Sequence, residues 1–324
     1  MNDLRYEILK KIRDKNTRSI AIVMHNKPDG DAIGSAIALE KALKNYGKKI
    51  VDLIIHDKIH ERFAPVVGSN RVNKIILPPE GRRYDLLIMV DFSDPTRTIS
   101  NIKKRAKFII VIDHHVHSKP FGNIYLCEKA AATGILIYKI IKSLTPISPE
   151  IATALYLAIR SDTGSYKNSN TDSKAHQITS ELLIYGASIE TVNSIYESRS
   201  FSFIKLMGST LLNVKLDKKY KIAYLIVTRY DIELSGSPED EISMLIDQIR
   251  GIKDCDMAFL FIEGIHNVRI SARSKNRPVN KILEHFGGGG HAKAAGCAIE
   301  GEFVNDIAYK VIEYAKECID ENIC

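Results

Sequence analysis

The chain has 324 residues, 45% of them hydrophobic and 26% charged, and its net charge is +7 with a pI near 9.0. This length predicts about two domains and allows a sizeable core without disulfides or a structural metal. The basic charge is compatible with anionic ligands such as nucleotides, but many basic proteins bind no nucleic acid.

The cysteine pattern and the N-terminal residues argue against a secreted or membrane protein. The five cysteines form no CxxC pair and no even-numbered framework, which is typical of a reduced, intracellular protein. Residues 1–16 predict a charged amphipathic helix rather than a signal peptide. No run approaches the roughly 18 apolar residues that a membrane span needs. We therefore expect a cytoplasmic protein with no membrane partner.

In the first half of the chain, β-rich apolar runs alternate with helical patterns. Four runs are almost continuously apolar, as buried parallel strands are, at residues 19–24, 49–55, 85–90 and 108–112. The spacing of apolar residues predicts helices at 31–46, 130–144, 149–160, 172–185 and 188–206. This alternation predicts an α/β domain with a doubly wound, mostly parallel sheet over residues 1–187.

The pattern changes after residue 206. Strands are predicted at 220–228, 257–263 and 268–273. Helices are predicted at 239–250, 279–285 and 303–319. These elements indicate a smaller α+β domain over residues 207–324, which a helical linker at 188–206 joins to the first domain. We expect a cleft between the two domains.

Charged residues and histidines follow three of the predicted strands. His25 follows the first strand, Asp91 the third, and the run Asp113-His114-His115 the fourth. In an open parallel sheet ligands bind outside the carboxyl ends of the strands, so these side chains can meet at one edge. With their neighbours they give six candidate metal ligands: His25, Asp29, Asp31, Asp91, His114 and Asp162. Each residue alone also fits a helix cap, a turn or an exposed position.

The six candidates have the chemistry of a site for two cations. Four clustered carboxylates repel one another and raise their pKa values, whereas two divalent cations supply four compensating charges. Oxygen-rich sites with some imidazole and no thiolate suit Mn²⁺ or Mg²⁺. Two such ions roughly 3.5–4 Å apart hold a phosphoryl group and activate a water. The pattern therefore predicts hydrolysis of phosphoesters.

Four segments carry a family resemblance. HNKPDGD at 25–31, VDFSD at 90–94, DHH at 113–115 and SDTG at 161–164 resemble, in this order, the four motifs of the DHH phosphoesterase superfamily. The resemblance implies two Mn²⁺ ions, with Mg²⁺ or Co²⁺ as substitutes. It implies that His25 and Asp29 bind the first ion, that Asp91 bridges, and that the second ion is bound by Asp31, His114 and Asp162.

The same resemblance implies three catalytic residues. Asp91 is expected to bridge the two ions, and Asp113 to orient the site from behind the ligands. His115 is expected to lie near the scissile phosphate, as a phosphate ligand or as a proton donor to the leaving group.

A second signal is the run FGGGGHAKAAGC at 286–297. Consecutive glycines let backbone N–H groups approach an anion, although glycine-rich loops are often flexible hinges. Alternate residues of the strand at 268–273 place Arg269 and Arg273 on one face. Arginines on such a face are commonly solvated, but near a glycine loop they can bind phosphate.

GGGHAKAAG at 288–296 resembles the GGGHxxAAG signature of the DHH-associated C-terminal domain. The resemblance implies that this domain binds substrate. With His115, the expected substrate-binding residues are Arg273, Ser274, Gly288, Gly289, Gly290 and His291. The assignment of Arg273 and Ser274 depends on SARS at 271–274, which is a loose motif.

The two-domain architecture resembles the nanoRNase/pAp phosphatase group and the stand-alone cyclic-di-AMP phosphodiesterases. We expect a phosphoesterase that hydrolyses RNA of a few nucleotides, linear dinucleotides such as pApA, and 3′-phosphoadenosine 5′-phosphate; cyclic di-AMP is the alternative substrate. The chain has no Trp and 7% aromatic residues, which disfavours long DNA or other long strands as partners. A pyrophosphatase or polyphosphatase, a non-catalytic nucleotide-binding protein, and a homodimeric state also remain open.

Overall fold

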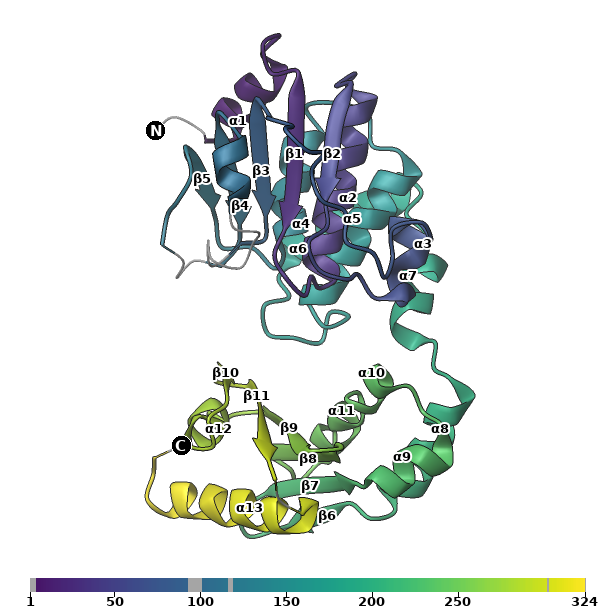
Figure 1. Cartoon of the computed structure of the whole chain (residues 1–324), viewed down its shortest axis with the longest axis vertical. Coiled ribbons are helices and arrows are strands. Elements are labelled where there is room, and N and C mark those ends of the chain that lie inside the picture. Colours follow the sequence, from purple (N-terminus) through teal and green to yellow (C-terminus); the bar gives the residue numbers. More distant parts are fainter. Residues whose placement is uncertain (1–3, 93–100, 116–118, 302, 324) are drawn as a thin grey trace. The chain divides into compact units, whose positions relative to one another are not determined.

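In the computed structural model, which describes residues 4–92, 101–115, 119–301 and 303–323, the chain divides into two units. The first is Met1–Ser198 and the second Arg199–Cys324 (Figure 1). The segment predicted as a helical linker, 188–206, is divided between them. It contains two helices, and Ser200 caps the second by accepting a hydrogen bond from the Phe203 N–H.

The first unit is built on a parallel sheet. Its strands are β1 (Ser19–Met24), β2 (Ile50–Ile54), β3 (Leu86–Val90), β4 (Ile109–Asp113) and β5 (Ile124–Cys127). They pair in the order β2-β1-β3-β4-β5, so the chain reverses direction across the sheet at β1, as in doubly wound folds. The first four strands were predicted. The sequence did not predict β5, because this strand has only four residues, lies at the sheet edge and is mostly half-buried.

Helices lie before, between and after these strands in the chain. The helices are α1 (Leu4–Arg13), α2 (Gly30–Asn45), α3 (Ala64–Val67), α4 (Thr133–Ile141), α5 (Pro149–Asp162), α6 (Ser173–Ile184) and α7 (Ile189–Glu197). Two 3₁₀ helices, η1 (Glu61–Phe63) and η2 (Ile102–Arg105), lie in the connections.

Strand residues alternate between two cores, as the period of a pleated strand requires. Ile20 and Ile22 of β1 pack in the main core with residues of α2, α4 and α5. Ala21 and Val23 pack in a smaller cluster on the other face, with Ile102 of η2. Burial on both faces explains why these strands are continuously apolar in sequence.

The second unit contains a mixed sheet in the order β10-β11-β9-β8-β7-β6. Its strands are β6 (Lys215–Asp217), β7 (Ile222–Val227), β8 (Met257–Glu263), β9 (Asn267–Ser274), β10 (Gly289–His291) and β11 (Ala294–Glu300). Only the pair β7–β8 is parallel. Its helices are α8 (Phe201–Leu211), α9 (Arg229–Ser235), α10 (Glu239–Ile242), α11 (Leu245–Arg250), α12 (Asn280–His285) and α13 (Val304–Asp320).

Sequence patterns predicted the central strands of this unit but not its edges. β7, β8, β9, α12 and α13 fall where they were expected. The helix predicted at 239–250 is divided into α10 and α11 around Ser243. The glycine run was expected to be a loop, whereas part of it forms β10, paired with β11. No helix in the described part of the chain is both long and apolar enough to cross a membrane.

Candidate metal centre

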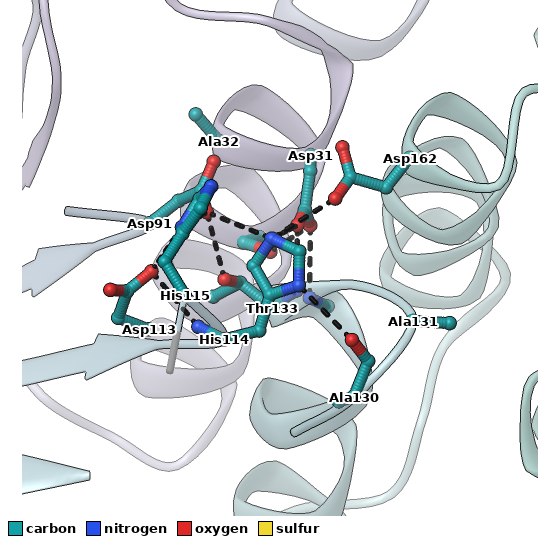
Figure 2. Close-up of polar contacts among 12 residues, drawn as sticks. Asp31, Ala32, Asp91, Asp113, His114, His115, Ala130, Ala131, Thr133 and Asp162 are labelled. Carbon is teal, nitrogen blue, oxygen red and sulfur yellow. Dashed lines mark hydrogen bonds and ion pairs between the residues drawn. The ribbon is translucent and has the colours of Figure 1, made fainter. Parts of the chain in front are cut away.

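The predicted ligands gather at the carboxyl edge of the parallel sheet. His25 directly follows β1, Asp91 directly follows β3, and Asp113 ends β4 with His114 and His115 after it. Helices supply the rest: Asp29 and Asp31 lie at the N-terminus of α2, and Asp162 is the last residue of α5. Figure 2 shows Asp31, Asp162 and His114 converging from these separate elements.

The turn before α2 is shaped by a helix cap and a close contact. Asp29 Oδ1 accepts hydrogen bonds from the N–H groups of Asp31 and Ala32, both at 3.0 Å. Gly30, between the two aspartates, lies against the end of α5, and a Cβ there would come within 2.6 Å of Ser161 Oγ and 2.3 Å of Tyr196 Oη. Glycine therefore lets this turn approach Asp162, the neighbour of Ser161.

Among the described residues, three groups of side chains are arranged so that they could hold a metal ion. In each group, one ligand atom per residue lies within 4.8 Å of the others. The groups are His25, Asp29 and Asp91; Asp31, His114 and Asp162; and Asp91, His114 and His115. Asp91 belongs to two groups, and it is 2% exposed. This carboxylate lies at the centre of the cluster.

Hydrogen bonds orient two imidazoles towards the carboxylates. His25 Nδ1 lies 2.7 Å from the Asn26 carbonyl, and His114 Nδ1 lies 3.1 Å from the Ala130 carbonyl. A carbonyl only accepts, so each Nδ1 carries a proton and each Nε2 has a lone pair in the neutral ring. His25 Nε2 lies 3.6 Å from Asp91 Oδ2, and His114 Nε2 lies 3.0 Å from Asp162 Oδ2. Histidines that bind metals are usually held in this way.

The electrostatics also favour cations. Burial, together with the charges of Asp91 and Asp162, raises the pKa of Asp31 well above its usual range. Burial would lower the pKa of His114, but the bond to Asp162 and the nearby carboxylates raise it to about 10. Protons thus stabilise the cluster when no cation is bound. A divalent cation would replace these protons, and the donor set of carboxylate oxygens and imidazole nitrogens fits such cations.

Asp113 and His115 form a pair behind the ligands. Asp113 is fully buried, and its Oδ1 accepts hydrogen bonds from His115 Nδ1 at 2.7 Å and from the His114 N–H at 2.9 Å. The bond to Asp113 raises the pKa of His115, whose side chain is 40% exposed. Asp113 therefore fixes the ring of His115 and favours its protonated form.

Sequence reasoning missed the N-terminus of α4. The N–H groups of Thr133 and Gly134 and the hydroxyl of Thr133 donate to two of the predicted ligands. A threonine at the start of an apolar helix is an ordinary sequence feature, so only the structure reveals these contacts. Ser93 and Asp94 of the VDFSD segment lie outside the described residues.

In the second unit, the glycine run forms a tight hairpin. Gly290 has φ +143°, and a Cβ there would lie 2.5 Å from the Ala294 carbonyl oxygen. A Cβ on Gly288 would lie 2.5 Å from the Gly296 carbonyl oxygen. Both positions require glycine to bring β10 against β11. His291 ends β10, and its side chain is exposed.

Arg273 and Ser274 lie on opposite faces of β9. Arg273 pairs with Ala294 of β11 and is half-buried, with no carboxylate oxygen within 4.0 Å among the described residues. Burial lowers its pKa. Ser274 is buried, and its hydroxyl donates to the Arg277 carbonyl. The structure thus places Arg273, but not Ser274, on the same face as Arg269.

A parallel α/β sheet whose strand ends gather four carboxylates and three imidazoles is the architecture of a metal-dependent phosphoesterase. Comparison with known families agrees. The model of the DHH family, N-terminal domain, matches residues 19–159, and that of the DHHA1 domain matches residues 218–317. The chain belongs to the DHH family and is a metal-dependent hydrolase that acts on phosphoesters.

Individual relatives extend over most of the chain. The bifunctional oligoribonuclease and PAP phosphatase NrnA of Thermus thermophilus is 30% identical over 96% of this chain and 92% of its own length. The cyclic-di-AMP phosphodiesterase GdpP of Bacillus subtilis is 25% identical over 97% of this chain but 49% of its own length. An exopolyphosphatase-related protein from Bacteroides fragilis has a similar structure, with a TM-score of 0.86, 26% identity, and coverage of 97% and 95%.

Proposed function

We propose that this protein is a two-metal hydrolase of very short RNA, linear dinucleotides such as pApA, and 3′-phosphoadenosine 5′-phosphate. The observation that carries the proposal is that Asp91 belongs to the ligand group of His25 and Asp29 and also lies 3.7 Å from His114, which belongs to the ligand group of Asp31 and Asp162. The substrates follow from the name of the Thermus thermophilus relative, an oligoribonuclease and PAP phosphatase that matches nearly the whole chain.

The chain would hold the two ions through separate ligand groups. His25, Asp29 and Asp91 are proposed to hold one ion, and Asp31, His114 and Asp162 the other. We propose that Asp91 also reaches the second ion, because its Oδ1 lies 3.7 Å from His114 Nε2. We propose Mn²⁺, with Mg²⁺ or Co²⁺ as substitutes, because the donors are mostly carboxylate oxygens with some imidazole. When bound, such ions polarise phosphoryl oxygens and lower the pKa of water.

His115 is the proposed partner of the reacting phosphate. Asp113 accepts from its Nδ1 at 2.7 Å and so fixes the orientation of the ring. The bond to Asp113 raises the pKa of His115, which favours the protonated ring. His115 can therefore bind the phosphate or donate a proton to the leaving oxygen.

Residues of the second unit are proposed to bind the rest of the substrate. Arg273 is half-buried without an ion pair among the described residues, and a guanidinium in this state is suited to a phosphate. The exposed His291 and the backbone of Gly288, Gly289 and Gly290 lie on the neighbouring hairpin. Ser274 remains a predicted substrate-binding residue, although its hydroxyl already bonds the Arg277 carbonyl.

Cyclic di-AMP is the second candidate substrate. The match to GdpP covers 97% of this chain, which favours an activity on cyclic dinucleotides. That match covers only half of GdpP, and the Thermus thermophilus protein is matched along nearly its full length. Linear substrates are therefore our first proposal.

A substrate panel with the purified protein tests the proposal. We would incubate it with Mn²⁺ and pApA, short RNA, cyclic di-AMP, 3′-phosphoadenosine 5′-phosphate or pyrophosphate, and measure the mononucleotides and phosphate released. We expect turnover of pApA and short RNA. Release of phosphate from pyrophosphate alone would contradict the proposal and favour a pyrophosphatase, and dinucleotide binding without hydrolysis would favour a non-catalytic protein.

The variant Asp91→Ala tests the two-metal arrangement. We expect kcat on pApA to fall by roughly a thousandfold, because the Asp91 carboxylate lies beside an imidazole of each proposed ion site, His25 and His114. Asp254→Ala is the matched control, since this aspartate is exposed in the second unit. Near-normal turnover by Asp91→Ala would refute the assignment.

A further inference from the structure

Helix α4 begins without a cap from its own side chains. Its N-cap residue, Ala132, makes no side-chain hydrogen bond, so the first N–H groups of the helix need other acceptors. The Thr133 N–H donates to Asp31 Oδ2 at 2.6 Å, and the Gly134 N–H donates to Asp31 Oδ1 at 2.9 Å. A carboxylate of the metal centre therefore caps this helix from a distant part of the chain.

The Thr133 side chain contacts a second carboxylate. Its hydroxyl donates to Asp91 Oδ1 at 3.0 Å, and the whole residue is buried. Figure 2 shows Thr133 directed at Asp91 from the side of α4. One residue thus bonds Asp31 through its backbone and Asp91 through its side chain.

The hydroxyl bond is made to one particular oxygen of the Asp91 carboxylate. Asp91 Oδ1, which the hydroxyl contacts, lies 3.7 Å from His114 Nε2. Oδ2, the other oxygen, lies 3.6 Å from His25 Nε2. The two oxygens therefore face ligands of different groups, which is the orientation that a bridging carboxylate needs.

We propose that Thr133 is a positioning residue that holds Asp91 in its bridging orientation and Asp31 in its ligand orientation. This inference rests on the proposed two-metal centre. Thr133 would act through the two carboxylates that it contacts, Asp31 and Asp91. Residues that orient metal ligands typically change metal affinity about 10–100-fold when they are replaced.

Substitutions of Thr133 can separate the effect of its N–H bond to Asp31 from the effect of its hydroxyl bond to Asp91. Thr133→Val keeps the N–H bond to Asp31 and a similar shape, but removes the donor to Asp91. Thr133→Ser keeps both donors. Thr210→Val is the matched control, because Thr210 is also buried and donates its hydroxyl only to the Leu206 carbonyl within α8.

Metal binding is the decisive measurement. We would titrate Mn²⁺ into metal-free protein by calorimetry and record the EPR spectrum of the loaded protein, in which two bridged Mn²⁺ ions couple magnetically. We expect Thr133→Val to raise the Kd for Mn²⁺ about 10–100-fold and to weaken the coupled signal. Thr133→Ser should stay within about threefold of the original protein, and Thr210→Val should be unchanged.

The outcomes of the Mn²⁺ titration distinguish failure of the Thr133 inference from failure of the proposed two-metal centre. If Thr133→Val binds Mn²⁺ with unchanged Kd and an unchanged coupled signal, even with a lower Tm, its role is structural and the inference is wrong. If the original protein binds no Mn²⁺ pair, the proposed function fails instead. Thr133→Ala, which adds no methyl group beside Asp91, answers the same question if Thr133→Val does not fold.

Discussion

Asp85 shows how a single carboxylate stabilises the fold at the end of β3 opposite to Asp91. It accepts hydrogen bonds from Lys107 Nζ at 2.8 Å, from the N–H groups of Arg18 and Ser19, and from the Ser19 hydroxyl. These donors, with Lys107 first, hold its pKa well below the usual range. The residue lies directly before β3 and ties it to the start of β1.

The variant Asp85→Asn should have a pH-dependent stability cost. Because the folded pKa is lowered, the stabilisation is present above the unfolded pKa of about 3.9 and is lost as pH falls through the folded pKa. We expect Asp85→Asn to lose about 1–2 kcal/mol of unfolding free energy at pH 7, and this difference to shrink below about pH 4. Urea denaturation of metal-free protein at several pH values measures it, with Asp254→Asn as the control. A cost that does not change with pH would contradict the charge-based explanation.

The sequence predicts the positions of some residues of the site but not of others. His25, Asp91 and His114 follow strands, and the rule that parallel strands end at one edge was enough to predict that they lie together. Thr133 could not be predicted in this way. Its partner Asp31 lies 102 positions earlier, and the contact depends on how α4 packs against α2. Sequence patterns indicate the ligands, but not the donors that orient them.

At the scale of elements, the crossing of α2 and α5 depends on Gly34. A Cβ at this position would lie 2.3 Å from the Ala154 carbonyl oxygen and 2.8 Å from the Ala158 amide nitrogen. Both are backbone atoms of α5, so the two helices would have to separate. The same two helices carry Asp31 and Asp162, which links this packing to the metal centre.

The variant Gly34→Ala should therefore lower both stability and metal affinity. We expect a loss of about 1–3 kcal/mol of unfolding free energy from overpacking, together with weaker Mn²⁺ binding. Gly208→Ala in α8 is the matched control, because nothing lies within 4 Å of its added Cβ. There the gain in helix propensity should stabilise by about 0.5–1 kcal/mol. Denaturant unfolding and calorimetric titration measure both effects, and an equal gain in the two variants would contradict the packing argument.

Long apolar elements were predictable, and short or glycine-containing ones were not. β1 was predicted at residues 19–24 and occupies Ser19–Met24, because its apolar run ends at His25. β10 has only three residues and includes two glycines, which normally indicate a loop. It is a strand because it pairs with β11, which in turn pairs with β9. Long-range pairing of this kind leaves no local pattern in the sequence.

At the scale of the whole molecule, the two units have different chemistry. All three metal-binding groups found among the described residues come from the first unit. The second unit contributes Arg273, the glycine hairpin and the exposed His291, which suit an anionic ligand. We therefore propose that the first unit binds the ions and that the second binds the remainder of the substrate.

The variant His291→Ala tests this division. We expect kcat/KM on pApA to fall about 10–100-fold, because a charge-assisted or neutral hydrogen bond to substrate is lost, while the Kd for Mn²⁺ stays the same. Hydrolysis of bis(p-nitrophenyl) phosphate, which carries no nucleoside, should change little. His266→Ala is the control, because His266 is also exposed in the second unit. An unchanged kcat/KM on pApA would remove His291 from substrate binding, and a loss of Mn²⁺ affinity would show that the units do not act separately.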